Sequence, residues 1–229
     1  MSQPKDFMED DERFPELHDL LNSYSFAGNT FTDTADEPGT ALQAYVRHAV
    51  RTPGRLDAVI GEIDDLLQVG LFSDEIADDV DILPHIDPPS GWTVEQCLAI
   101  VRSHLERIRG GGTYGKPRLP QTDWEWRKQF PEVSMLLGAR FNQEFPRLYA
   151  SHREALDDHF SLTDEESLAE LVEELGSLLS LAESDAELDS ATQTLGLQIY
   201  PPDGVSLRQW LTDIRDIVKH RLHIGAPPT

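Results

Sequence analysis

Two proline-rich turns, each followed by an amphipathic segment, constrain this chain more than any other feature. Residues 201–204 read Pro-Pro-Asp-Gly, which favours an extended segment and then a tight turn, because proline fixes φ and glycine reaches conformations that other residues avoid. Ser206 and Gln209 follow with the spacing of a capping box. Apolar residues then recur three and four positions apart, as on a helix face that packs on a core: Leu207, Trp210, Leu211, Ile214 and Val218.

The same design occurs earlier in the chain. Residues 88–91 read Pro-Pro-Ser-Gly, and Thr93 and Gln96 have capping-box spacing. An apolar stripe follows at Val94, Cys97, Leu98, Val101 and Leu105. Equivalent positions, such as Thr93 and Ser206, lie 113 residues apart. A period of this length indicates two whole domains, because solenoid repeats are only about 20 to 50 residues long.

Other predicted helices recur with similar offsets. Phe14-Pro15-Glu16-Leu17 and Phe130-Pro131-Glu132-Val133 both favour a helix start, since proline is tolerated in the first turn. Thr40 with Gln43, and Ser151 with Glu154, have capping-box spacing. The helix predicted at 55–69 has six apolar positions, each matched 112 residues later: Leu56, Val59, Ile60, Ile63, Leu66 and Leu67 by Leu168, Leu171, Val172, Leu175, Leu178 and Leu179. Small shifts between offsets are what loop insertions in a duplicated domain produce.

We therefore predict an all-α protein with two tandem homologous helical domains of about four to five helices each. The predicted domains are residues 14–109 and 130–229, the first being a divergent copy of the second. Residues 1–13 are predicted to be a disordered acidic tail, and the glycine-rich residues 110–129 a linker. Trp124 and Trp126 lie in this linker, and we expect at least one to pack on a domain because both are too apolar to remain in water.

The charge of the chain limits its partners. A formal net charge of -23 and a pI near 4.5 disfavour binding to DNA, RNA or anionic lipid, whose phosphates would repel it. An acidic protein is suited to a basic partner, although a surface kept acidic only for solubility is the alternative. The start of the chain lacks a basic segment followed by an apolar run, and no apolar run approaches the roughly 20 residues of a membrane span. We predict a cytoplasmic protein that does not bind membranes.

Catalytic and metal sites find little support. Cys97 is the only cysteine and lies on an apolar stripe, so neither a disulfide framework nor a zinc cluster is expected. His220 and His223 could share a helix face, but cations near a helix end explain them better. Asp157, Asp158 and His159 are better explained as a solvated helix face than as an acid and base pair. Asp78, Asp79 and Asp81 lack the glycine and glutamate of a calcium loop. We predict no enzyme activity, cofactor or metal.

The second half of the chain resembles the immunity proteins of contact-dependent growth inhibition and related bacterial toxin systems. The resemblance rests on FPEV at residues 130–133, RFNQEF at 140–145, and YPPDG with LRQWL at 200–211. The first half is a weaker copy with FPEL, the same stripes and the PPSG turn. It has Cys97 where the second half has Trp210, and SFAGNTF in place of RFNQEF. The resemblance implies a helical protein that binds and neutralises a cognate toxin without chemistry of its own.

The predicted function is therefore stoichiometric inhibition of a protein toxin. An acidic surface laid over the basic cleft of a nuclease-type toxin would associate rapidly and block substrate entry. An acidic helical adaptor or chaperone, not specific to one toxin, is the main alternative, and a metal-dependent hydrolase is a third. We expect the immunity protein to act as a monomer.

Acidic residues off the core stripes mark two candidate partner-binding regions. In the first half they are Asp64, Asp65, Asp74, Glu75, Asp78 and Asp79. In the second half they are Asp164, Glu165, Glu170, Glu173 and Glu174, to which we add Asp157, Asp158, Asn142 and Gln143. Chance clustering in so acidic a chain is the competing explanation. We favour the second region, because its half of the chain carries the stronger family resemblance.

Overall fold

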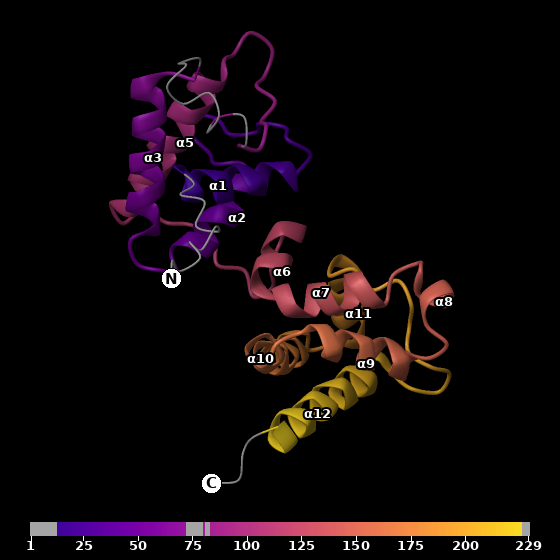
Figure 1. The fold of residues 1–229 in the computed structure, drawn as a ribbon. Coiled ribbons are helices and arrows are strands. Elements are labelled where there is room, and N and C mark those ends of the chain that lie inside the picture. Colours follow the sequence, from indigo (N-terminus) through magenta and orange to yellow (C-terminus); the bar gives the residue numbers. More distant parts are fainter. Residues whose placement is uncertain (1–12, 72–79, 81–82, 226–229) are drawn as a thin grey trace, which may run out of the picture. The chain divides into compact units, whose positions relative to one another are not determined.

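The computed structural model describes residues 13–71, 80 and 83–225, and these residues confirm the all-α class. Eleven α-helices and a single isolated bridge, between Thr30 and Asp87, make up the regular structure of this part (Figure 1). The chain divides into two compact units, Met1–Lys116 and Pro117–Thr229, which we call unit 1 and unit 2. None of the described helices is long and apolar enough to cross a membrane.

Unit 1 is built on four helices in its described part: α1 (Pro15–Ser25), α2 (Thr40–Ala49), α3 (Arg55–Val69) and α5 (Val94–Arg109). The predicted apolar stripes face its core, and α1 packs against both α2 and α3 while α3 packs along α5. The capping box predicted at the start of α5 is present, with the Gln96 amide donating to Thr93 Oγ1 and the Thr93 amide donating to Gln96 Oε1.

The capping box predicted at Thr40 and Gln43 is wrong. Thr40 is the first residue of α2 rather than its N-cap, which is Gly39. The Gln43 side chain donates to the Pro38 carbonyl at 2.8 Å instead of accepting from the helix start. Spacing alone cannot place a cap when the helix begins one residue earlier than expected. At Ser206 only half of the predicted box forms, because the Gln209 amide donates to Ser206 Oγ but its side chain bonds Asp213.

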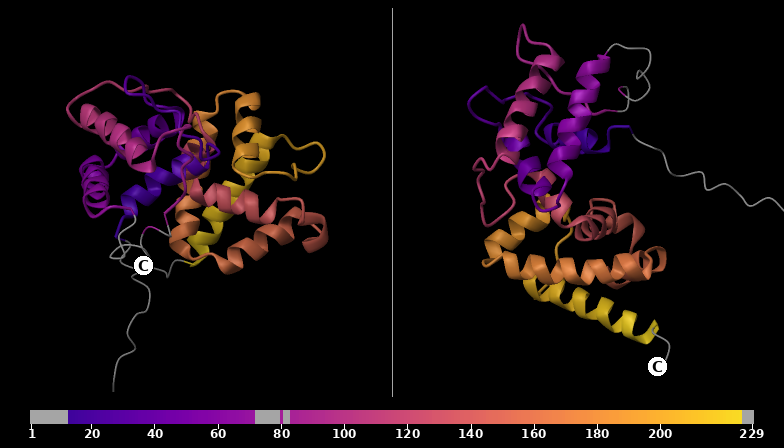
Figure 2. Two further views of the ribbon diagram at one scale, coloured as in Figure 1. Left: turned by 90° about the horizontal axis from the view of Figure 1, so that it is seen from above. Right: turned by 90° about the vertical axis from the view of Figure 1, so that its left-hand side faces the viewer.

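Unit 2 contains α6 (Asp123–Gln129), α7 (Pro131–Arg140), α8 (Phe145–Leu148), α9 (His152–Leu162), α10 (Glu165–Leu181), α11 (Asp185–Thr194) and α12 (Leu207–Gly225). The long helices α10 and α12 lie side by side, and α7 packs against α10 (Figure 2). The core is continuous through these helices and includes Phe141, Leu171, Leu175, Trp210 and Ile214. Helices α6, α8 and α11 are additions to the predicted pattern.

Helix α6 lies within residues 110–129, which we expected to be a linker. Thr122 and Glu125 form a full capping box, which starts a helix within this segment. Trp126 belongs to the core of unit 2, as expected for at least one of the two tryptophans. The burial of an aromatic ring therefore orders the last part of a segment whose glycine and proline content favours a loop.

Helices α1 and α7 begin in the same way. Each follows a buried phenylalanine, Phe14 with φ −129° and ψ 54° and Phe130 with φ −135° and ψ 58°. Each has proline in its first turn and no N-cap side chain that accepts from the helix. Their first free amides must therefore find acceptors elsewhere in the fold.

Candidate functional site

A glutamate from α10 supplies the missing acceptor at the start of α7. The amide of Val133 donates to Glu174 Oε2 at 2.9 Å. Burial raises the pKa of Glu174 to about 7, and the Glu132 and Glu170 carboxylates add to this, against the lowering effect of hydrogen bonds from the amides of Val133 and Glu132. Glu174, which we predicted as part of the partner-binding surface, is thus half-buried and caps a neighbouring helix.

Glu132 and Glu170 lie close enough to Glu174 to raise its pKa, and Asp164 and Glu170 act in the same way on Glu132. Burial raises the pKa of Glu132, and the charges of Glu170 and Asp164 raise it further. The Oε2 atom of Glu132 is buried and has no hydrogen-bond partner among the described residues. We call these four residues, Glu132, Asp164, Glu170 and Glu174, the carboxylate cluster. Within the described part of the chain no ion pair to Glu132, Glu170, Glu173 or Glu174 is present, so the cluster lacks a neutralising cation.

The remaining acidic residues predicted on α10 are exposed. Asp164 is the N-cap of this helix and accepts from the Ser167 amide at 2.8 Å, which lowers the pKa of its carboxyl. Glu165, Glu170 and Glu173 follow on its exposed surface. Of the predicted residues of α10, the structure places Glu174 and Glu170 beside the start of α7. Asp157 and Glu165 also line an open groove between α9, α10 and α12.

Other predicted residues of unit 2 serve its own structure. Asp158 accepts from the Tyr149 hydroxyl at 2.7 Å and forms an ion pair with Arg140 at 3.2 Å. The Asn142 side chain donates to the Gly138 carbonyl and accepts from the Glu144 amide, which holds the turn after α7. Gln143 is exposed, and its backbone amide donates to the side-chain oxygen of Gln198.

We had expected His159 to lie on a solvated helix face, and the structure does not place it there. Its side chain is buried, and burial lowers its pKa to about 4, with the positive charge of Arg140 adding to this effect. The imidazole is therefore neutral near pH 7 and packs beside Phe160. His220 and His223 are exposed, and His223 Nδ1 lies 2.7 Å from the Lys219 carbonyl. The described residues include no group of three or more His, Cys, Asp or Glu that could hold a metal ion.

The described acidic residues predicted in unit 1 are paired with arginines. Asp64 forms an ion pair with Arg102, and Asp65 with Arg13. Asp74, Glu75, Asp78 and Asp79 lie outside the described residues. The described acidic residues that we singled out in this unit are therefore neutralised within the fold.

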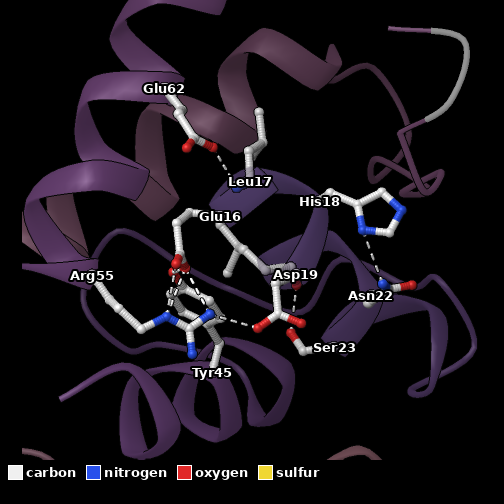
Figure 3. A network of polar contacts seen from close by, with 10 residues as sticks. Glu16, Leu17, His18, Asp19, Asn22, Ser23, Tyr45, Arg55 and Glu62 are labelled. Carbon is white, nitrogen blue, oxygen red and sulfur yellow. Dashed lines mark hydrogen bonds and ion pairs between the residues drawn. The ribbon is translucent and has the colours of Figure 1, made fainter. Parts of the chain in front are cut away.

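Unit 1 contains its own version of the helix cap. Glu62 of α3 accepts from the Leu17 amide at 2.7 Å, just as Glu174 accepts from Val133 (Figure 3). Beside it, Arg55 donates to Glu16 and Asp19. Our sequence reasoning did not single out Glu16, Glu62 or Glu132. The only signal was that Glu62 and Glu174 share the 112-residue offset of the apolar stripes.

A family model described as CdiI immunity protein matches residues 129–218. This part of the chain is therefore similar to the CdiI immunity protein family. The CdiI match runs from the end of α6 into α12 and contains the whole carboxylate cluster. It confirms the resemblance seen in the second half of the sequence, and it indicates a toxin-neutralising immunity function with a toxin as partner. The two tandem copies stay a prediction, because the CdiI match does not extend into unit 1. No curated protein and no solved structure gave a significant match.

Proposed function

We propose that this protein neutralises a nuclease-type toxin by binding its basic active-site cleft in a one-to-one complex, without chemistry of its own. The carrying observation is the group of exposed carboxylates on α10 that form no ion pair with the described residues, inside the part of the chain that matches the CdiI family model. Unpaired charges at a surface are available to a partner, whereas those of unit 1 at Asp64 and Asp65 are already neutralised.

Electrostatics explains why such a surface suits this task. The chain carries a net charge of -23, so it attracts a basic protein over distances near the Debye length, about 8 to 10 Å at physiological salt. Because Glu165, Glu170 and Glu173 lie on a long helix that packs against α7 and α12, their positions are fixed before binding. Fixed complementary charges raise the association rate and suppress wrong partners. Nucleic acid is the substrate of such a toxin, so we propose that the complex forms in the cytoplasm.

Co-expression with the cognate toxin domain, to be sought among the genes beside this one, tests the proposal. We expect cells that carry both proteins to grow, cells that carry the toxin alone to die, and a one-to-one complex to purify in which nuclease activity is blocked. Growth protection without a complex would contradict binding as the mechanism. The same purification, repeated with an active-site variant of the toxin, separates binding from any loss of toxin expression.

The acidity of the chain also supports a general adaptor for basic proteins. Competition distinguishes the two functions. An immunity protein should keep its toxin in the presence of a large excess of an unrelated basic protein such as cytochrome c. An adaptor would exchange one for the other with similar affinities, and this outcome would replace the immunity function.

A further inference from the structure

We propose that the carboxylate cluster of unit 2 binds an arginine side chain of the toxin, in the place that Arg55 occupies in unit 1. This inference rests on the proposed function and deepens it, because it names the chemical group that the partner must provide. Its starting point is a difference between two sites of closely similar construction, one complete and one lacking its cation.

The complete site is in unit 1 (Figure 3). Arg55 Nε donates to both carboxylate oxygens of Glu16, at 2.9 and 2.8 Å, and its Nη2 donates to Asp19 at 2.7 Å. The Tyr45 hydroxyl donates to Glu16 at 3.2 Å. The side chains of Arg55, Glu16 and Asp19 are mostly buried, with 16%, 22% and 11% exposed. A single guanidinium thus neutralises two carboxylates beside the start of α1.

The corresponding place in unit 2 is identified by its surroundings. Glu16 and Glu132 both follow the proline that opens their helices. Next to each, a glutamate from the neighbouring long helix accepts from the following amide: Glu62 from Leu17 and Glu174 from Val133. The offset of 112 that relates Glu62 to Glu174 also relates the apolar stripes of α3 and α10, which fixes the register of the comparison.

In this register the cation of unit 1 has no counterpart. Ser167 stands at the position of Arg55, and Glu170 stands at the position of Ala58. Leu156 and Met135 replace Tyr45 and Asp19 through the offsets of their own helices. Unit 2 has therefore lost a guanidinium and gained a carboxylate at the same place.

The consequences are visible at Glu132. Its buried Oε2 has no partner among the described residues, whereas the equivalent carboxylate in unit 1 accepts three hydrogen bonds. A buried acceptor without a partner is unfavourable, and the nearby charges of Glu170 and Asp164 increase the cost of ionising it. A cation beside the carboxylate would lower the cost of ionising it.

Arginine fits this place better than a metal ion. A planar guanidinium carries five N–H donors and can bridge carboxylates that are too far apart to share one ion. The absence of a metal-holding group among the described residues agrees with that spacing. Unit 1 shows the same arrangement occupied by arginine.

Ser167→Arg tests the site without any partner. We expect the introduced guanidinium to lower the pKa of Glu132, which burial and the neighbouring carboxylates now raise, as measured by NMR titration of side-chain carboxyl resonances. It should also raise the melting temperature. Ser180→Arg is the matched control, because it adds the same charge at an exposed position near the other end of α10. Equal effects of the two substitutions on the pKa of Glu132 would overturn the inference.

Binding to the cognate toxin domain tests the role of the site. Ser167→Arg should weaken toxin binding by about tenfold or more by occupying the site, while Ser180→Arg should change it much less. Glu132→Gln and Glu170→Gln should each accelerate dissociation by about tenfold, since they remove one carboxylate from a charged pair. Unchanged dissociation in both glutamine variants would contradict the inference and leave the immunity function intact. Failure of the wild-type protein to bind the toxin would instead contradict the proposed function, and the titration of Ser167→Arg would still decide whether the site accepts a guanidinium.

The same titration distinguishes arginine from a divalent metal ion as the ligand of the cluster. Addition of N-acetyl-arginine amide should lower the pKa of Glu132 in the wild-type protein and have no such effect in Ser167→Arg. A larger shift with magnesium or calcium chloride than with this arginine probe would show a cation site of a different kind and overturn the assignment to arginine.

Discussion

Units 1 and 2 each cap one helix start with a glutamate from a neighbouring helix, but they differ in whether the adjoining carboxylate is paired with a cation. In both, a helix that begins with Phe-Pro-Glu lacks an N-cap side chain and receives a glutamate from a neighbouring helix. Unit 1 then neutralises the adjoining Glu16 with Arg55, while unit 2 leaves Glu132 without a cation. The difference teaches that acidity alone does not mark a binding surface, because the state of pairing decides which charges a partner can use.

The two acidic regions predicted from the sequence do not occupy corresponding positions. Asp64 and Asp65 of unit 1 correspond by the 112-residue offset to Gly176 and Ser177 of unit 2. Conversely, Glu170 and Glu173 correspond to Ala58 and Gly61. These four acidic residues thus lie on different parts of α3 and α10, and of the four only Glu170 and Glu173 form no ion pair in the described structure. The following predictions test this contrast, beginning with the largest expected effect.

The cores of the two units should differ most at the position of Trp210 and Cys97. Trp210 is 5% exposed and packs edge-on against Phe141 at 4.9 Å between ring centroids. Trp210→Ala should lower the free energy of unfolding by about 3 to 5 kcal/mol through lost burial and a residual cavity. Urea unfolding measures this change. Cys97→Ala, which removes only a small buried atom, should cost less than half as much, and equal costs would contradict the contrast.

Removal of the internal guanidinium should make unit 1 resemble unit 2. Arg55→Met leaves Glu16 and Asp19 without their cation in a mostly buried place, so we expect a loss of about 2 to 4 kcal/mol in the free energy of unfolding. The control is Arg102→Met, whose ion pair with Asp64 is exposed and should contribute little. A stability unchanged by Arg55→Met would mean that the pairing in unit 1 is not what distinguishes the units.

The pH dependence of stability should carry the signature of Glu174. Its pKa in the folded protein is raised to about 7, above the value of an exposed glutamate. The folded state therefore binds a proton more tightly, and this contribution is present at low pH and lost as the pH rises from about 4.5 through 7. Glu174→Gln should remove that loss, which we put at about 1 to 2 kcal/mol after allowance for solvent screening.

Urea titrations at pH 5 and pH 8 measure this difference. Glu173→Gln serves as the control, because Glu173 is exposed on the same helix. If wild type and Glu174→Gln lost the same stability between the two pH values, burial of the carboxylate would not be the cause.

The smallest effect on folding, with a clear effect on binding, is expected at Glu173. Glu173→Lys should slow association with the toxin and weaken its dependence on salt, because it reverses an exposed charge beside the cluster. Stopped-flow measurements at several salt concentrations give both quantities. Asp203→Lys, which makes the same charge change in the exposed Pro-Pro turn, should alter the rate less. Equal slowing would indicate general attraction by net charge rather than a surface on α10.

Local patterns in the sequence determined most of the helices. The apolar stripes of α3, α5, α10 and α12, the prolines that open α1 and α7, and the capping box at Thr93 each depend on residues a few positions apart. Such spacing fixes which face of a helix can be buried, and this is why the helical class and the core positions followed from it. The family match in the second half likewise agreed with short motifs read from the sequence.

Only the tertiary structure decided which charges remain without partners. Glu174 looked like an exposed residue of an acidic helix until α7 was seen to place its amides beside it. Asp64 looked available until α5 brought Arg102 to it, and Glu132 attracted no attention until its carboxylate was found without a cation. Helix α6 formed where composition favoured a linker, because Trp126 is buried in the core. Each of these outcomes depends on segments far apart in the chain, and periodicity within one helix carries no information about the neighbour that packs against it.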